Sequence, residues 1–476
     1  MNISHYHEAR ILKNRHYDGH FFFAVKTTGI FCRPSCPSPI AKEENVVYYP
    51  TIFDALDHGY RPCLRCRPDI HTDYYSVGID GGELVVQGLT MIYEGFLNNH
   101  SIPELSAALY VSPRYLRQLF MTHLGLPPIK VAKYHQCLFA KKLLLTTDLF
   151  ITDIAYASGY RSIRQFNDAF KTLFKASPRA IRQQVSPAIN QGIIIPYDDT
   201  FDFDSTIEFM GQRALTGVEQ ITKTTYTRTF RRGQHSGYFT VTNQPELQAL
   251  SLVINTDDVR SYMPIYQQVR RMFDLNTDFA PINAALIKDP LLKEGMTNGM
   301  VPRIPLAFNP FEFVIRAILG QVVSVSFATT LAQRLVTRCD IQTPADFPDG
   351  LNYFFPTPEE LGPIDLTELG MTRTKIATIS HVIEALLTHR LDLDYRQSYD
   401  NFRNSFLPIK GIGDWTVNYV AMRALGMRDA FPYSDLAIIK AFSSIDHKAS
   451  HAQIKAAAES WRPYRAYGTM CLWNRH

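Results

Sequence analysis

The sequence predicts a multidomain protein that is mainly helical, with parts of mixed α+β structure. Its 476 residues exceed one ordinary domain, and a hydrophobic content of 46% indicates folded cores throughout. Four cysteines fall within the first 70 residues, and a two-glycine turn lies near the C-terminus. We expect a small cysteine-rich domain at 1–80, an all-α domain at 85–187, an α+β domain at 190–300 and an all-α domain at 301–476.

Charge is distributed unevenly along the chain. The net charge is only +4, but residues 101–190 contain twelve Lys/Arg and four Asp/Glu. This concentration predicts a polyanion-binding module. The sequence has no apolar signal segment and no run of eighteen apolar residues, which predicts a soluble, cytoplasmic protein without a membrane partner. In that compartment the seven cysteines are not expected to form disulfides.

The first domain contains the pattern CxxxC…CxxC, formed by Cys32, Cys36, Cys63 and Cys66. Two ligand pairs on separate turns can close a tetrahedral site for one zinc ion. The commoner use of such a site is purely structural, and the spacing alone leaves that interpretation open. The other cysteines, which lie in apolar helical surroundings and are predicted to be core residues, are Cys137, Cys339 and Cys471.

Residues 18–69, with the runs 23–36, 44–46 and 60–63, resemble the methyl-sensing zinc domains of the Ada type. The resemblance implies that Cys32 irreversibly takes a methyl group from a DNA methylphosphotriester. Zinc keeps sulfur as the nucleophilic thiolate, and methylation removes one negative charge from the site. That change is worth about 1 kcal/mol against a phosphate at ~4 Å in water, which would tighten DNA binding. The loop 37–40 lacks the basic residues usual in the family.

Two helix-turn-helix patterns follow within residues 101–185. Ser101 and Glu104 form a capping box, and Ser112-Pro113 begins a second helix; the pattern recurs from Ile151 to Phe174. A short helical bundle has the same periodicity. By position, the residues facing the major groove are Arg114, Arg117 and Gln118 in the first unit and Arg161, Ser162, Arg164 and Gln165 in the second. Residues 153–182 resemble AraC-type transcription factors, which implies promoter DNA and RNA polymerase as partners.

The C-terminal half changes from mixed to helical patterns. Strand-like runs occur at Ile193–Ile195, Tyr238–Val241 and Leu250–Ile254, among helical patterns. From Pro310 on the chain is predicted to be helical.

A glycine turn near the C-terminus organises this half. Gly411 and Gly413 give the turn a permissive backbone, and the helix from Asp414 would point its N–H groups at a DNA phosphate. Asp435 begins a further helix over 436–442. The alternative is a surface helical hairpin with an aspartate that only caps a helix.

Together with Pro196–Asp198, Phe311–Ser326, Phe355–Pro358 and Trp461–Tyr467, this segment resembles the AlkA-type alkylpurine glycosylases of the helix-hairpin-helix superfamily. The resemblance implies that Asp435 is the catalytic carboxylate. It further implies a base pocket of Trp415, Tyr419 and Trp473, a backbone grip at Gly411 and Gly413, a wedge at Val322 and room for a monovalent cation at the hairpin turn. Core packing remains the alternative for the aromatic residues, and a buried helix for 317–324.

The chemistry suits a carboxylate. A target base must leave the duplex, and an N-alkylated purine is already a cationic leaving group, so the enzyme needs mainly an anion beside the developing oxocarbenium ion. Aromatic faces attract a cationic base by about 0.5–2 kcal/mol. Trp415 stands where bifunctional relatives carry a Schiff-base lysine, which predicts a monofunctional glycosylase.

The whole chain resembles an Ada–AlkA fusion. This implies an adaptive response to DNA alkylation, combining methyl transfer to Cys32, methylation-enhanced transcriptional activation and excision of alkylated purines of the 3-methyladenine type. It also implies a monomeric bacterial protein that binds double-stranded DNA in the nucleoid. The alternative is a non-enzymatic, zinc-containing AraC-type transcription factor whose glycosylase-like half binds DNA without turnover.

Overall fold

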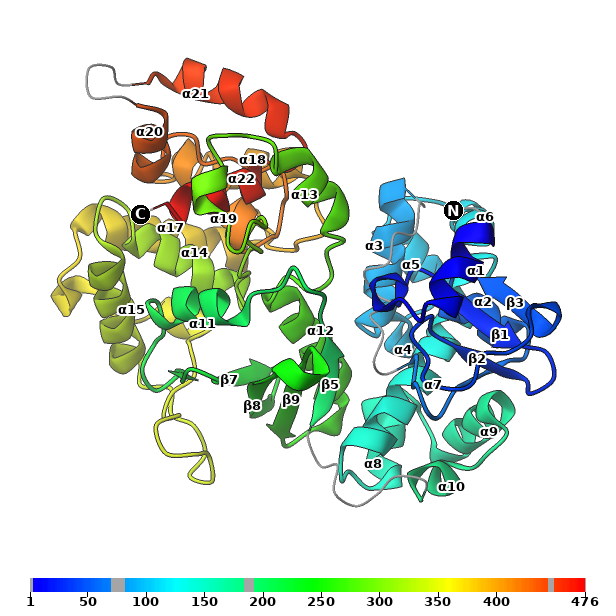
Figure 1. The fold of residues 1–476 in the computed structure, drawn as a ribbon. Coiled ribbons are helices and arrows are strands. Elements are labelled where there is room, and N and C mark those ends of the chain that lie inside the picture. The colour runs from blue at the N-terminus through cyan, green and yellow to red at the C-terminus, as the bar shows by residue number, and fades with distance from the viewer. Residues whose placement is uncertain (1–2, 70–81, 184–191, 444–448, 476) are drawn as a thin grey trace. The chain divides into compact units, whose positions relative to one another are not determined.

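The computed structural model describes residues 3–69, 82–183, 192–443 and 449–475 (Figure 1). The chain forms two compact units. The first comprises residues 1–197 and 241–268, and the second residues 198–240 and 269–476. The α+β region predicted at 190–300 therefore contributes to both units. No helix within the described ranges combines the length and apolar character that a membrane crossing requires.

The N-terminal part of the first unit is built on a four-stranded sheet of order β3-β1-β2-β4. Strand β1 pairs antiparallel with β2 and β3, and β2 pairs parallel with β4. The elements are α1 (Ile3–Ile11), η1 (Arg15–Tyr17), β1 (Phe22–Val25), β2 (Ile30–Cys32), η2 (Glu43–Asn45), β3 (Val46–Tyr49), α2 (Ile52–Asp57) and β4 (Arg61–Pro62). The parallel pairing brings the ends of β2 and β4 together, and each end leads into a cysteine pair.

The next part of the first unit is all helical, and both helix-turn-helix patterns are confirmed. Its helices are α3 (Gly82–Tyr93), α4 (Phe96–Asn99), α5 (Ile102–Ala108), α6 (Pro113–Leu124), α7 (Pro128–Thr146), α8 (Ile151–Ala157), α9 (Ile163–Phe174) and α10 (Pro178–Arg182). Ser101 and Glu104 form the predicted capping box, and the side chains of Ser112 and Ser162 cap α6 and α9. Each cap satisfies a backbone N–H that the helix start would leave free.

Helix α7 is the central element that the sequence patterns do not reveal. It contacts α3, α6, α8, α9 and α10, so most of its sides are buried. Its buried residues include His135, Lys141 and Lys142 among the apolar ones, so the sequence shows no single apolar face. The two helix-turn-helix motifs are thus arranged around one shared helix.

The first unit also contains β5 (Ile193–Pro196), η3 (Pro245–Leu247), β9 (Ala249–Thr256) and η4 (Val259–Ser261). β5 and β9 pair antiparallel, with Ile195 opposite Leu250. Strand β8 (His235–Gln244) and helix α12 (Tyr262–Met272) each run across the boundary between the units. The three predicted strand segments, at 193–195, 238–241 and 250–254, are confirmed.

The second unit begins with α11 (Phe203–Gly211) and the antiparallel pair β6 (Glu219–Ile221) and β7 (Thr225–Arg232). From Asn309 on it is helical, as predicted. The remaining elements are α13 (Ala280–Leu286), η5 (Lys293–Gly295), α14 (Pro310–Leu319), α15 (Val325–Cys339), α16 (Pro358–Leu361), η6 (Thr367–Leu369), α17 (Arg373–Leu387), α18 (Tyr399–Phe406), α19 (Asp414–Arg423), α20 (Leu436–Phe442), α21 (His451–Ala457), η7 (Ala458–Trp461) and α22 (Arg465–Trp473).

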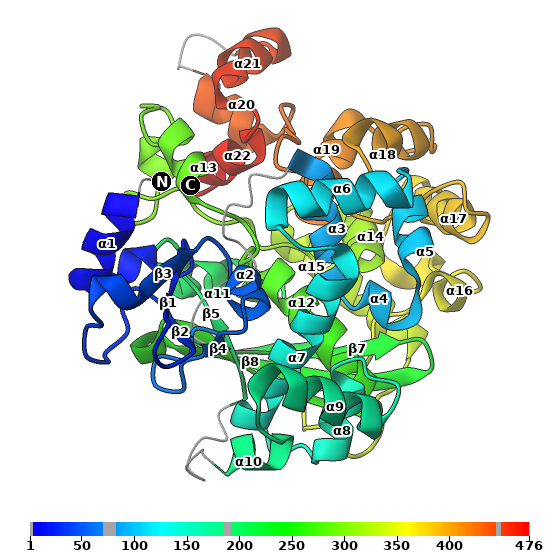
Figure 2. The ribbon, with the colours of Figure 1, turned by 90° about the vertical axis from the view of Figure 1, so that its right-hand side faces the viewer.

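One apolar core holds these helices together. Helix α14 contacts α15, α17 and α19, and α20 contacts α21 and α22 (Figure 2). Ile315, Val417 and Leu335, from α14, α19 and α15, are fully buried in this core. Because α19 and α20 both start beside it, the residues at their N-termini are held on a rigid support.

Candidate functional sites

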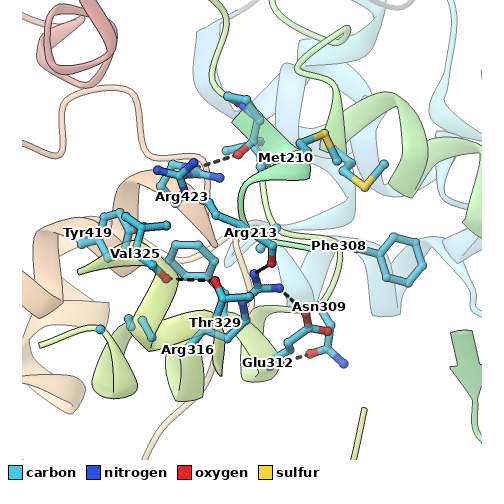
Figure 3. Close-up of a pocket in the computed structure, with 18 of the residues that line it drawn as sticks. Met210, Arg213, Phe308, Asn309, Glu312, Arg316, Val325, Thr329, Tyr419 and Arg423 are labelled. Atoms are coloured by element: carbon cyan, nitrogen blue, oxygen red, sulfur yellow. Dashed lines mark hydrogen bonds and ion pairs between the residues drawn. The ribbon is translucent and has the colours of Figure 1, made fainter. Parts of the chain in front are cut away.

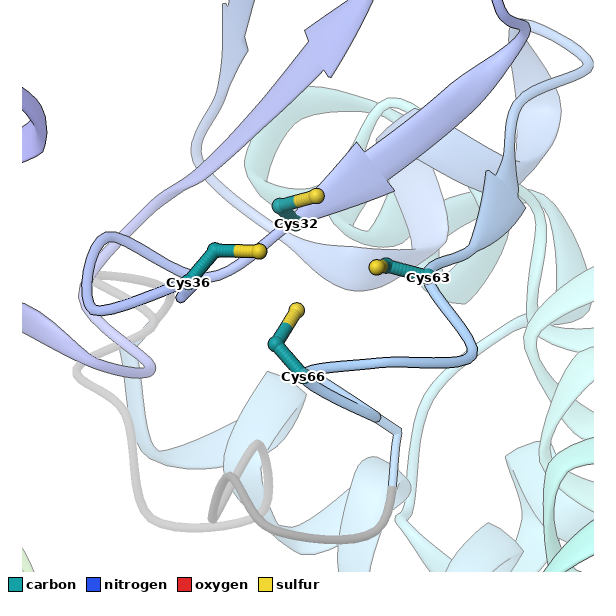
Figure 4. Close-up of side chains that lie close together, drawn as sticks. All are labelled: Cys32, Cys36, Cys63 and Cys66. Atoms are coloured by element: carbon teal, nitrogen blue, oxygen red, sulfur yellow. The ribbon is translucent and has the colours of Figure 1, made fainter. Parts of the chain in front are cut away.

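The four cysteines predicted to bind zinc lie together (Figure 4). The sulfur atoms of Cys32, Cys36, Cys63 and Cys66 all fall within 4.8 Å of one another, and each cysteine is buried. Four thiolates at tetrahedral spacing are the donor set of a zinc site with Zn–S bonds of about 2.3 Å, so these residues fit one zinc ion. Hydrogen bonding with Cys32 lowers the pKa of the Cys36 thiol to about 6.

A half-buried carboxylate that the sequence did not single out supports the first cysteine loop. Asp18 accepts hydrogen bonds from the backbone N–H of Ser35 and from Nη1 of Arg33, each at 2.9 Å. Both donors lie between Cys32 and Cys36, so Asp18 fixes the turn that presents this ligand pair. Burial raises the pKa of Asp18, against the lowering effect of Ser35 and Arg33.

A cavity of about 260 Å³ opens beside this centre. Cys32, Cys36 and Cys63 reach its wall, while most of its lining is apolar, including Phe23 and Ile40. Two cations, Arg10 and Lys13, also line this cavity, so its wall offers charged partners as well as apolar contacts.

The seven residues predicted to face the major groove are all exposed on α6, α9 or the turn before α9. Arg161 also donates from Nε and Nη2 to the backbone carbonyl of Asn98, at 3.4 and 3.3 Å. This contact holds the second turn against the end of α4.

In the second unit, Asp435 is held at the start of α20 by three donors. Its carboxylate accepts hydrogen bonds from the backbone N–H of Ala437 at 3.0 Å, from Nε1 of Trp415 at 3.0 Å and from Nε1 of Trp473 at 3.2 Å. Asp435 is therefore a helix cap, as the alternative interpretation proposed. However, two indoles also orient the carboxylate, and capping requires neither of them.

The three predicted aromatic residues form one cluster. The rings of Trp415 and Tyr419 stack with centroids 4.9 Å apart, and Tyr419 meets Trp473 edge-on at 5.9 Å. All three rings, together with Asp435, line a cavity of about 400 Å³. An aromatic cavity with a carboxylate in its wall can hold a flat, electron-poor ring and stabilise positive charge beside it.

The same cavity contains a group of charges that the sequence gave no signal for (Figure 3). Arg228 pairs with Glu219 at 2.9 Å and also with Glu312, while Arg316 pairs with Glu312 at 2.9 Å. Two further arginines, Arg213 and Arg423, also line the cavity. These residues come from the turn after α11 and from β6, β7, α14 and α19. Only the tertiary fold brings them together.

The hairpin joins α18 to α19, and its two glycines differ. Gly411 has a φ of +95°, and a Cβ there would lie 1.9 Å from Oγ1 of Thr378, so only glycine fits. Gly413 has a φ of −113°, and a Cβ there would meet nothing within 4 Å. The expectation that both glycines supply backbone freedom is therefore wrong for Gly413. Its absent side chain leaves open space in front of the N-terminus of α19.

Val322 lies in the turn between α14 and α15. It is fully exposed and has a φ of +58°, a conformation that a β-branched residue rarely adopts. The alternative of a continuous buried helix over 317–324 is wrong, because α14 ends at Leu319. The neighbouring Gln321 donates from Nε2 to the carbonyl of Gly411 at 3.1 Å and to Oγ1 of Thr416 at 3.0 Å. The exposed valine is thus tied to the hairpin.

Comparison with known proteins gives three family matches along the chain. Residues 5–69 match the metal binding domain of Ada, residues 105–184 match a helix-turn-helix domain, and residues 193–309 match the AlkA N-terminal domain. The matches follow the order of the elements described above.

Three relatives cover different lengths of the chain. A probable bifunctional transcriptional activator/DNA repair enzyme AlkA of Mycobacterium tuberculosis is 32% identical over 469 residues, covering 97% of this chain and 94% of the relative. DNA-3-methyladenine glycosylase 2 of Escherichia coli is 30% identical over 280 residues, covering 57% and 93%. The bifunctional transcriptional activator/DNA repair enzyme AdaA of Bacillus subtilis is 32% identical over 176 residues, covering 37% and 81%.

The similarity to the mycobacterial protein extends over nearly all of both chains. An Ada-like zinc domain, an AraC-type helix-turn-helix domain and an AlkA-like glycosylase region are joined in one polypeptide. The chain therefore belongs to the family of bifunctional transcriptional activator/DNA repair enzymes of the AlkA type.

Proposed function

We propose that the second unit is a monofunctional DNA glycosylase that releases alkylated purines of the 3-methyladenine type, with Asp435 as its catalytic carboxylate. The observation that carries this proposal is the placement of Asp435, held by two indole N–H groups in the wall of an aromatic cavity. A base stacked on Trp415 or Tyr419 would place its sugar near that carboxylate.

The chemistry follows from this placement. The glycosidic C–N bond breaks and its electron pair leaves with the base, so positive charge develops on the sugar. Asp435 stabilises that charge because it is a fixed anion that need not reorganise. Water then adds to the anomeric carbon, and its proton passes to the carboxylate or to solvent. In bifunctional relatives this position of the hairpin holds the lysine whose amine forms a Schiff base and leads to strand cleavage. Trp415 has no such amine, so the strand stays intact.

DNA would be held and opened by the neighbouring turns. The hairpin presents the N-terminus of α19 to a backbone phosphate, and Gly413 leaves room for close approach. Val322 protrudes fully and would fill the space that the flipped nucleotide vacates. The turn that ends in Gly413 is also where a monovalent cation would bind.

The first unit would sense damage and regulate transcription. Sulfur of Cys32 attacks the methyl carbon of a methylphosphotriester; an S–C bond forms, the C–O bond breaks, and the phosphodiester leaves as an anion. Bound zinc would keep the sulfur as a thiolate. Four thiolates around one zinc ion would carry a net negative charge, which favours the neutral triester over an ordinary, anionic phosphate. The thioether that forms has lost one negative charge, so the surface binds DNA more tightly.

Transcriptional activation would use α6 and α9 in successive major grooves, with Arg114, Arg117 and Gln118 on α6 and Arg161, Ser162, Arg164 and Gln165 at α9. RNA polymerase is the partner that this activity requires. We further propose that the protein acts as a monomer in the bacterial cytoplasm, bound to the nucleoid.

The glycosylase is tested with purified full-length protein and methylated duplex DNA. The wild type should release methylated purines without cleaving the strand. Asp435→Asn should lower the single-turnover rate at least about a hundredfold while binding to an abasic-site duplex persists. Equal rates for the two proteins would remove Asp435 from the mechanism. DNA binding without any release by the wild type would favour the alternative, a transcription factor with an inactive glycosylase-like half.

Methyl transfer is tested by intact mass after incubation with DNA that carries methylphosphotriesters. A gain of one methyl group that is lost in Cys32→Ala supports sensing and repair. Cys137→Ala is the matched control, because Cys137 is buried and lies outside the metal site. No mass gain in the zinc-loaded wild type would leave the four cysteines with a structural role only.

A further inference from the structure

The cavity in the second unit carries more positive than negative charge at one end. Glu219 and Glu312 are both engaged by Arg228 and Arg316. Arg213 and Arg423 also line the cavity and belong to no such pair. Within the described residues, no ion pair to either arginine is found.

The guanidinium of Arg423 is fixed by its surroundings but keeps one group free. Its Nε donates to the carbonyl of Pro305 at 2.7 Å, and the guanidinium lies 4.6 Å from the ring centre of Phe209. Nη1 is buried and has no hydrogen-bond partner among the described residues. Arg213 lies over the same ring at 3.7 Å and donates to the carbonyl of Phe209 at 2.8 Å. Figure 3 shows Arg213, Arg423 and Tyr419 among the residues that line the cavity.

Burial lowers the pKa of both side chains, which records the cost of keeping these cations out of water. The lowered pKa of Arg423 is about 10, so it stays charged at neutral pH. A buried N–H without an acceptor costs free energy until a ligand supplies one.

Helix α19 sets the distance between this group and the catalytic carboxylate. Trp415, Tyr419 and Arg423 are spaced four residues apart and form one stripe along the helix. With a rise of about 1.5 Å per residue, Arg423 lies about 12 Å farther along the axis than Trp415. Trp415 contacts Asp435, so the stripe runs from the carboxylate, past the aromatic rings, to the cation.

A purine placed along this stripe has a defined orientation. Its glycosidic nitrogen must lie beside Asp435, so the opposite edge of the six-membered ring points toward Arg423. That edge carries the O6 carbonyl, an acceptor, in guanine and the N6 amino group, a donor, in adenine. We infer that Arg423, supported by Arg213, is a specificity-determining residue that favours alkylated guanine over alkylated adenine by donating to O6. This inference rests on the proposed glycosylase activity.

The test measures 7-methylguanine and 3-methyladenine released from the same methylated duplex by full-length protein. In Arg423→Met, which keeps the apolar stem, 7-methylguanine release should fall about tenfold or more, as for a lost charge-assisted hydrogen bond. Release of 3-methyladenine should fall less than about threefold, so the ratio of the two products drops. Arg423→Lys keeps a cationic donor and should restore part of the ratio. Arg213→Met should change the ratio in the same direction by a smaller factor.

The control variant is Arg390→Met, because Arg390 is exposed and pairs with the exposed Glu384. It should leave both releases unchanged. If Arg423→Met does not fold, the ratio of 7-methylguanine to 3-methyladenine released by Arg213→Met and by Arg423→Lys decides whether the inference holds. An equal loss of both products, or an unchanged ratio, would overturn the inference and leave the glycosylase proposal intact. Failure of the wild type to release either base would overturn both.

Discussion

Nε1 of Trp415 donates a hydrogen bond to Oδ2 of Asp435 at 3.0 Å, across twenty residues of sequence. The chain has three tryptophans, and each indole N–H meets a carboxylate: Trp473 meets Asp435 at 3.2 Å, and Trp461 meets Asp289 at 2.7 Å. Two of these bonds converge on one aspartate. An ordinary helix cap needs only a backbone N–H donor, so the two indole donors distinguish Asp435 from a residue that only caps a helix.

We expect Trp415→Phe to slow base release while preserving the aromatic wall. The variant removes one charge-assisted hydrogen bond, worth about 1.5–3 kcal/mol, so the single-turnover rate should fall about tenfold to a hundredfold. Trp461→Phe removes an indole N–H that contacts Asp289 and should lower stability with little effect on the rate. Similar rates for both variants would show that orientation by Trp415 is not needed.

The two hairpin glycines should respond differently to alanine. Gly411→Ala places a Cβ 1.9 Å from Oγ1 of Thr378 at a φ of +95°, so thermal unfolding should shift clearly downward. Gly413→Ala meets no atom of the protein, so the unfolding temperature should stay within a few degrees. Its affinity for duplex DNA should nevertheless fall if a phosphate approaches that turn. Unchanged affinity in Gly413→Ala would argue against the proposed backbone grip.

Val322→Gly should lower base release without lowering the stability of the protein. Glycine relieves a left-handed conformation that costs a β-branched residue of order 1–3 kcal/mol, which offsets the greater chain entropy of glycine. Stability should therefore be maintained or rise, as measured by denaturant unfolding. Base release should fall, because nothing fills the vacated space in the duplex. Full activity in this variant would contradict the wedge assignment.

Zinc removal should affect the first unit alone. All three tryptophans lie in the second unit, so their fluorescence reports on the glycosylase region. A strong chelator, or Cys66→Ser, should remove the single zinc and the methyl-transfer activity, because structural zinc sites supply folding free energy. Tryptophan fluorescence and base release should stay unchanged. Loss of base release on chelation would show that the two activities are coupled.

Acid should destabilise the second unit through Glu219. Burial alone would raise the pKa of this carboxyl, but Arg228 and Arg316 hold it below its ordinary value. A lowered pKa contributes stability that is present above the unfolded value of about 4.3 and is lost as pH falls through the folded value. Glu219→Gln should cost about 3–5 kcal/mol at pH 7, because it leaves Arg228 with one buried partner fewer. Unfolding followed by tryptophan fluorescence from pH 7 to 3 should show a shallower slope in the variant.

Much of this fold could be predicted from local sequence patterns. The cysteine spacing, the serine caps at Ser101, Ser112 and Ser162 and the alternating strands all depend on residues close in sequence. Helix α7 and Asp18 were missed for a related reason. The buried residues of α7 include His135, Lys141 and Lys142, so its sequence shows no single apolar face, and a supporting aspartate looks like any other until its partners are placed.

The sequence by itself predicted most of the elements and the side chains that we propose carry the chemistry, because caps, turns and cysteine pairs act over a few residues. Only the tertiary structure decided the environment of those side chains. The two indoles on Asp435, the exposed left-handed Val322 and the Nη1 of Arg423, which has no partner in the part of the chain that the structure describes, each depend on segments far apart in the chain. Burial and charge pairing are properties of that arrangement in space, and no local pattern encodes them.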